Sequence, residues 1–126
     1  MSYIKLDDVN EEHLLGTWRV KNRMFNASSA SHCFIAFQCI RFLKNNIFTA
    51  QNGTKRRGHW EMKREQEMIY NPQVMFHLSK NERVNSIITN LMTMDETHTK
   101  LILYFDSGFE LVLEKDANVN NCRKTK

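Results

Sequence analysis

The side chains that could carry chemistry are spread along this chain and do not form a catalytic or metal-binding motif. The five histidines are His13, His32, His59, His77 and His98. None stands in His-x-His or His-x-x-x-His spacing, which would place two imidazoles on one side of a single element. A cross-strand pair such as His59 and His77 could hold a metal, but surface histidines are the simpler interpretation. The sequence therefore predicts no metal site.

Motifs for catalysis are missing as well. The chain has no Gly-x-Ser-x-Gly, no glycine-rich phosphate loop and no glutamate-rich metal motif. Cys33 and Cys39 belong to an apolar stretch, which favours inert thiols over activated nucleophiles. Glu61, Glu110 and Glu114 fall on the outward register of their predicted strands. We therefore expect no catalytic residues and no cofactor, and a binding protein rather than an enzyme.

The three cysteines, Cys33, Cys39 and Cys122, are an odd number without Cys-x-x-Cys spacing. If Cys33 and Cys39 share one strand, they lie roughly 20 Å apart at about 3.3 Å per residue. A disulfide needs Cα atoms within about 7 Å, so buried reduced thiols are the simpler expectation and favour a reducing compartment. Residues 1–12 contain no apolar stretch typical of a secretory leader. This pattern predicts a cytoplasmic location, or export if a leader was removed, and no membrane span.

The net charge of +4 is distributed unevenly along the chain. Residues 1–13 are acidic, whereas residues 115–126 form a basic, polar tail that we expect to be disordered. The local basic patch is Lys55-Arg56-Arg57 with Lys63 and Arg64 beside Trp60, an arrangement that resembles a stacking site for single-stranded nucleic acid. A charged loop at the mouth of a barrel is the simpler interpretation, and it could attract an acidic head group. Weak binding of single-stranded nucleic acid is therefore our third hypothesis for the function.

Short alternating segments follow one another from residue 16 onwards, with no helix long enough for a crossover connection. We expect strands over residues 16–25, 32–43, 47–51, 58–64, 67–70, 74–78, 85–94, 101–105 and 109–113. Asn52-Gly53 and Asp106-Ser107-Gly108 are turn signals. The pattern predicts an all-β antiparallel meander of eight or nine strands, closed into a small barrel because closure removes unpaired edges. A short N-terminal helix capped by Asp7 or Asn10 could precede it.

Gly16-Thr17-Trp18 at the start of the first strand resembles the Gly-x-Trp signature of the lipocalin and calycin β-barrels. A second Gly-x-Trp stands at Gly58-His59-Trp60, and the order of elements from Leu14 to Glu114 is similar to small bacterial lipocalin-like domains. The chain then divides into an acidic N-terminal segment (residues 1–13), a lipocalin-like barrel (14–114) and a polar basic tail (115–126). The chain departs from the lipocalin pattern because its late strands carry no arginine to lie over the first tryptophan. It also lacks the helix pair and Arg-x-Tyr of fatty-acid-binding proteins and the further glycines of nitrobindin-type haem barrels, so haem is not implied.

The resemblance implies non-enzymatic binding of a small apolar or amphipathic molecule inside the barrel. The expected lining is Trp18, Phe42, Phe48, Trp60, Met62, Phe76 and Leu103, with Arg56 or Arg57 at the rim. A barrel of this size can instead be filled by its own side chains. In that alternative, the protein acts as a protein-interaction module, or a homodimer, through an apolar outer face around Ile35, Phe37 and Cys39.

Overall fold

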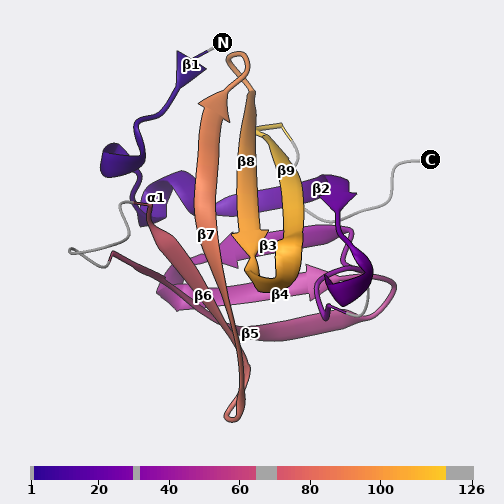
Figure 1. The fold of residues 1–126 in the computed structure, drawn as a ribbon. Coiled ribbons are helices and arrows are strands. Elements are labelled where there is room, and N and C mark those ends of the chain that lie inside the picture. The colour runs from indigo at the N-terminus through magenta and orange to yellow at the C-terminus, as the bar shows by residue number, and fades with distance from the viewer. Residues whose placement is uncertain (1, 30–31, 65–70, 119–126) are drawn as a thin grey trace.

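The protein is an antiparallel β-barrel in which each barrel strand pairs with the next and the last barrel strand pairs with the first. The computed structural model describes residues 2–29, 32–64 and 71–118 (Figure 1). The barrel strands are β2 (Gly16–Met24), β3 (Cys39–Leu43), β4 (Ile47–Gln51), β5 (Lys55–Lys63), β6 (Gln73–Ser79), β7 (Glu82–Thr93), β8 (His98–Phe105) and β9 (Phe109–Asp116). Pairing of β9 with β2 closes the sheet. The predicted all-β meander closed into a barrel is confirmed.

Short helical turns connect some strands and precede the barrel. They are η1 (Leu6–Asp8), α1 (Glu11–Leu14), η2 (Ala27–Ser29), η3 (Lys44–Asn46) and η4 (Asp106–Gly108). The expected N-terminal helix is present as α1, and Asn10 caps it by accepting from the backbone N–H of His13. The predicted strand at residues 67–70 lies outside the described residues. Within the described ranges, no helix is long and apolar enough to cross a membrane.

A short strand outside the barrel, β1 (Ser2–Tyr3), adds to the second half of β7. The first half of β7 pairs with β6 up to Ile87, and the second half pairs with β8. Beyond Ile87, the edge of β7 that pairs with β6 lower down is therefore available to the N-terminal segment. Figure 1 shows β1 beside the upper part of β7, apart from the strands that run across the barrel.

The two ends of the barrel are closed differently. At one end, called the α1 end below, α1 runs into β2 and buries Leu14 in the core. At the other end, called the Phe34 end, the segment between β2 and β3 turns inward and buries Phe34 and Phe37. Inward residues alternate with outward ones along the strands, as in Leu101, Leu103 and Phe105 of β8.

The prediction of one strand over residues 32–43 is wrong for its first part. Only Cys39–Leu43 forms a strand, and residues 33–36 form a turn. The stretch is apolar on both faces because Phe34 and Phe37 plug the barrel end. The expectation of buried reduced thiols is also wrong, because Cys33 is an exposed free thiol and Cys39 is buried and disulfide-bonded.

Candidate functional site

The predicted lining residues lie almost entirely in the barrel interior. Six of them are at most 2% exposed: Trp18, Phe42, Phe48, Trp60, Phe76 and Leu103. Met62 is half-buried and packs against the same core cluster. The sequence therefore placed these side chains on the correct face of their strands.

The interior at the Phe34 end is packed with aromatic rings centred on Phe76. Its ring centroid lies 4.8 Å from that of Phe34, 5.1 Å from Phe48 and 5.8 Å from Phe42. Phe105 extends the cluster, with its centroid 5.2 Å from that of Phe34. These tilted and edge-on contacts are the geometries that aromatic pairs prefer. In this structure the barrel end is filled by its own side chains.

Phe34 differs from the other rings because it comes from a turn and not from a strand. Its backbone N–H donates to the Nδ1 atom of His32 at 3.1 Å, and its carbonyl accepts from Phe37 at 3.2 Å. His32 stacks on Phe109 with a centroid distance of 4.6 Å, and burial lowers the pKa of this imidazole. Local turn contacts of this kind open at lower cost than a strand ladder bonded on both sides.

Arg56 stands at the rim of the Phe34 end. Its Nη2 atom lies 2.6 Å from the Oε1 atom of Glu82, which joins the start of β5 to the start of β7. Both side chains are partly exposed, so this ion pair is accessible to a competing anion. Burial raises the pKa of the nearby Cys33 thiol, and Glu82 raises it further.

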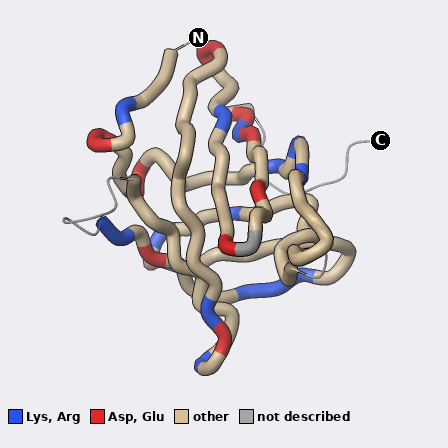
Figure 2. Tube along the Cα trace, in the orientation of Figure 1, with Lys and Arg blue, Asp and Glu red and all other residues tan. Residues whose placement is uncertain are grey.

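Arg57 points to the outer face of the barrel and not into its mouth. With His59 and His77, which face each other across β5 and β6, it lines an outer groove of about 620 Å³. Figure 2 shows the basic residues of this region along the start of β5 and at the β6–β7 turn. Trp60 is 2% exposed and donates through Nε1 to the carbonyl of Leu43. It therefore presents no face on which a nucleic-acid base could stack.

Gly58 is one of the residues that line this groove, and a larger residue does not fit at its position. A Cβ atom at this position would meet the backbone oxygen of His77 and would lie 2.7 Å from the Phe48 ring. The second Gly-x-Trp therefore allows β5 to approach β6 and Phe48 closely.

The first Gly-x-Trp belongs to a cation site at the α1 end. Trp18 donates through Nε1 to the carbonyl of Leu14 at 2.7 Å. Lys115, directly opposite Trp18 in the β2–β9 register, places its Nζ atom 4.8 Å from the centroid of the Trp18 ring. The same Nζ donates to the carbonyls of His13 at 3.1 Å and Leu15 at 2.9 Å. Lys115 thus satisfies carbonyls at the end of α1 while it covers the tryptophan.

Gly16 makes room for this lysine. Its φ of +126° is unfavourable for other residues, and a Cβ atom there would lie 2.8 Å from the Cδ of Lys115. Burial lowers the pKa of Lys115. Sequence reasoning missed Lys115 because it assigned residue 115 to the tail, whereas β9 continues to Asp116.

A second feature that the sequence did not indicate is an imidazole between two carboxylates. The Nδ1 atom of His98 lies 3.0 Å from Asp95, and its Nε2 atom lies 3.2 Å from Asp116. The hydrogen bond with Asp95 is the main cause that raises the pKa of His98. Backbone hydrogen bonding from Thr97 comes first among the causes that lower the pKa of Asp95 to about 2. The cluster ties the β7–β8 turn to the end of β9.

Among the described residues, no group of three or more histidine, cysteine or acidic side chains is placed to hold a metal ion. His59 and His77 are adjacent across two strands, but His77 contacts Glu61, with Nε2 and Oε1 3.6 Å apart. No family model, no curated protein and no solved structure matches this chain.

Proposed function

We propose that the barrel binds a small amphipathic molecule at the Phe34 end, with its apolar part inside and an acidic head group at Arg56. The observation that carries this proposal is Phe34 itself. It is a buried aromatic ring, 0% exposed, held among Phe76 and Phe105 by a turn and not by a strand ladder. A ligand that replaces this ring meets a preformed apolar wall.

The free-energy cost of displacing the Phe34 ring can be offset by burial of an alkyl chain. Removal of a buried phenylalanine side chain from a core costs about 3–5 kcal/mol. A ligand with an apolar chain of several methylene groups regains about 0.8 kcal/mol per buried CH₂. An alkyl chain of about eight carbons is therefore long enough to compensate for the displaced ring.

Arg56 is the residue of the predicted rim that suits an acidic head group. It lies on the inward register of β5, in line with Gly58 and Trp60, and directly opposite Ala50 of β4. Its present partner, Glu82, is a single carboxylate on the rim. A ligand carboxylate can take the place of Glu82 on the guanidinium without loss of the charge-assisted hydrogen bond.

The geometry at the α1 end supports a lipocalin-type relationship. A cation of the last strand lies over the tryptophan of the first Gly-x-Trp, with Lys115 in place of the arginine of that pattern. Small-molecule binding in lipocalin-like barrels is the function that this likeness suggests, although a shared architecture is compatible with many functions.

The first test compares two adjacent arginines. Binding of decanoate and decanol is measured by isothermal titration calorimetry with the wild type, Arg56→Gln and Arg57→Gln. We expect Arg56→Gln to weaken decanoate binding about fivefold, the equivalent of about 1 kcal/mol for a partly exposed ion pair. Decanol binding stays unchanged, and Arg57→Gln behaves like the wild type because its side chain is on the outer face. Equal effects of the two variants would contradict the assignment of Arg56.

The second test asks whether the ligand enters the barrel. Ala50 is fully buried beside Arg56, whereas the next residue, Gln51, is half-buried and has the opposite register. Ala50→Leu narrows the Phe34 end and is expected to abolish decanoate binding, at an overpacking cost of about 1–3 kcal/mol in stability. Gln51→Leu is the matched control and is expected to bind normally. Normal binding by a folded Ala50→Leu protein would place the ligand outside the barrel.

The interaction face suggested by the sequence is not available. Phe37 is 4% exposed and Ile35 is half-buried because this segment plugs the barrel end, and Cys39 of β3 is 5% exposed and disulfide-bonded. Small-molecule binding is therefore the proposal that the geometry supports best.

A further inference from the structure

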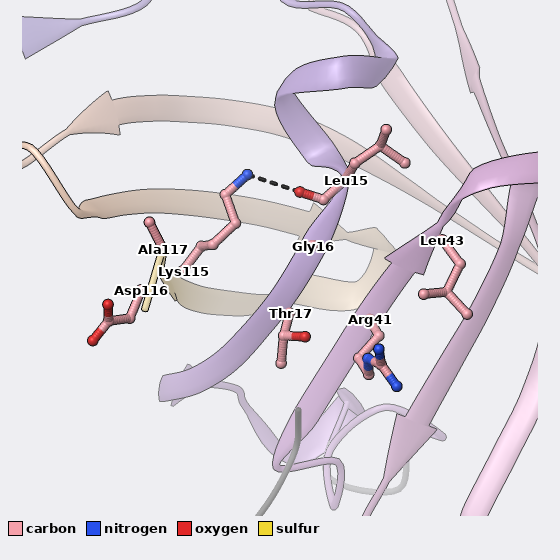
Figure 3. A pocket seen from close by; sticks show the side chains of 8 residues that line it. All are labelled: Leu15, Gly16, Thr17, Arg41, Leu43, Lys115, Asp116 and Ala117. Atoms are coloured by element: carbon pink, nitrogen blue, oxygen red, sulfur yellow. Dashed lines mark hydrogen bonds between the residues drawn. The ribbon is translucent and has the colours of Figure 1, made fainter. Parts of the chain in front are cut away.

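A hollow of about 370 Å³ lies on the outside of the barrel at the α1 end, opposite to the Phe34 end. Gly16 and Thr17 at the start of β2 form its floor. Arg41 of β3 stands on one side, and Lys115 and Asp116 of β9 stand on the other (Figure 3). We call this space the Arg41 hollow.

Arg41 is the unusual member of the hollow. In the strand register it lies directly between Thr17 of β2 and Thr49 of β4, which are only 6% and 4% exposed. Its Nε atom is buried and has no hydrogen-bond partner among residues 2–29, 32–64 and 71–118. Within the same residues, no carboxylate forms an ion pair with this guanidinium. Buried donors are normally satisfied, so an unsatisfied one calls for an acceptor.

Other arginines of this protein reach acceptors. Arg23, whose Nε atom is also buried without a partner among the described residues, donates through Nη2 to the carbonyl of Phe37. Arg56 pairs with Glu82, and Arg64 donates to the carbonyls of Leu6 and Val9. A guanidinium has five N–H donors in a planar fork. The fork of Arg41 is therefore free to bind two oxygens of one anion.

The lining of the Arg41 hollow carries two cations, Arg41 and Lys115, and one carboxylate. Lys115 lines the hollow, but its ammonium group is directed toward the carbonyls of His13 and Leu15 and away from Arg41, so it adds positive charge at the edge of the hollow (Figure 3). Thr17 supplies a hydroxyl on the floor. The one carboxylate of the lining, Asp116, lies 3.2 Å from His98 and points away from Arg41 in Figure 3. The lining therefore attracts negative charge.

We propose that the Arg41 hollow binds a small oxyanion, a phosphate or carboxylate group, held by the fork of Arg41 and the hydroxyl of Thr17, with the charge of Lys115 at the edge of the hollow. Arginine suits this role because its planar fork matches two oxygens of such a group. The site is separate from the one proposed at the Phe34 end, because the two lie at opposite ends of the barrel and share no residue.

In the experiment, the protein is titrated with inorganic phosphate and, separately, with acetate at constant ionic strength. Binding is measured by isothermal titration calorimetry and by the change in melting temperature. Wild type is expected to bind at least one of the two anions saturably, with a rise in melting temperature. Binding of phosphate alone identifies a phosphate group as the ligand, and binding of both anions identifies any small oxyanion.

Three variants locate the site. Arg41→Met is expected to weaken binding at least tenfold and to remove the anion-dependent rise in melting temperature. Thr17→Val is expected to weaken binding about threefold. Arg83→Met, which removes an exposed arginine of β7 remote from the hollow, is the matched control and keeps wild-type affinity. The melting temperature without anion verifies that each variant folds.

Two results would overturn the proposal. One is the absence of saturable binding of both phosphate and acetate to wild type. The other is binding by a folded Arg41→Met protein with the affinity of wild type. Loss of phosphate binding in Arg41→Met with normal decanoate binding would confirm that the two sites are independent.

Discussion

Gly16→Ala offers the sharpest test of the cation site at the α1 end. The substitution places a methyl group 2.8 Å from the Cδ of Lys115 and a non-glycine residue at a φ of +126°. Gly53 provides a matched control, because its φ is +106° and a Cβ atom there has nothing within 4 Å. Both substitutions cause backbone strain, but only Gly16→Ala displaces Lys115.

The expected loss of unfolding free energy is the sum of the backbone strain and the effect of displacing Lys115. A non-glycine residue in this backbone region costs about 1–3 kcal/mol, and we expect Gly53→Ala to lose that amount. Displacement of Lys115 weakens its hydrogen bonds to His13 and Leu15 and its contact with Trp18. We assign about 1–2 kcal/mol to this loss, because water solvates a partly buried ammonium once it moves away. Gly16→Ala is therefore expected to lose about 2–5 kcal/mol of unfolding free energy.

The assay is urea unfolding followed by far-UV circular dichroism. An excess loss of 1–2 kcal/mol lowers the midpoint by roughly 0.5–1 M relative to Gly53→Ala. The same pair of glycine substitutions is then measured in a Lys115→Ala background, where the excess should disappear. Equal losses for the two glycines in the wild-type background, or an excess that persists without Lys115, would refute this explanation of the first Gly-x-Trp.

The remaining predictions concern Gly58, His98 and Cys33. Gly58→Ala should lower the free energy of unfolding by at least about 3 kcal/mol, since its methyl group meets a backbone oxygen and a buried ring that cannot move aside; a soluble variant with a wild-type urea midpoint would contradict this. Because Asp95 chiefly raises the pKa of His98 in the folded protein, the stability that this imidazole adds is complete below about pH 6.5 and is lost as the pH rises through the raised pKa. The difference in unfolding free energy between wild type and His98→Gln should therefore shrink from pH 6 to pH 9, and a constant difference would exclude the effect. Burial and Glu82 raise the pKa of Cys33, so Glu82→Gln should speed its alkylation by iodoacetamide at pH 7.5 relative to a Glu96→Gln control, and equal rates would show that Glu82 has no influence.

The antiparallel meander was predictable because each hairpin is encoded locally. Leu101, Leu103 and Phe105 alternate with outward residues, the turn at residues 106–108 follows at once, and Phe109 and Leu111 resume the alternation. A period of two with turn residues between the runs is sufficient to define such a hairpin. The same reasoning placed the interior aromatic residues on the correct face.

The plug at residues 33–36 was not predictable from the period. Phe34 and Phe37 are buried, as are the apolar residues of the strand that follows. A turn and a strand have similar amino-acid composition when both contact the core, so composition does not distinguish them. Arg56 and Arg57 could have been distinguished, however. With Gly58 and Trp60 on the inner face, alternation places Arg56 inward and Arg57 outward.

Lys115 shows what a single sequence cannot provide. Its partner Trp18 lies far away along the chain, and only the register between β2 and β9 brings the two together. A shift of that register by one residue would place Lys115 on the opposite face. The cation site therefore depends on barrel closure, which no local pattern encodes.

Closure by β2 and β9 also has a consequence for how the chain folds during its synthesis. The other neighbours in the barrel are consecutive strands, which can pair as soon as both have been made. Until β9 is complete, β2 and β8 each present an unpaired edge, the kind of surface on which two unfinished chains can join. Completion of β9, the last strand of the barrel, thus ends the period in which these two edges are exposed and the risk of aggregation is greatest.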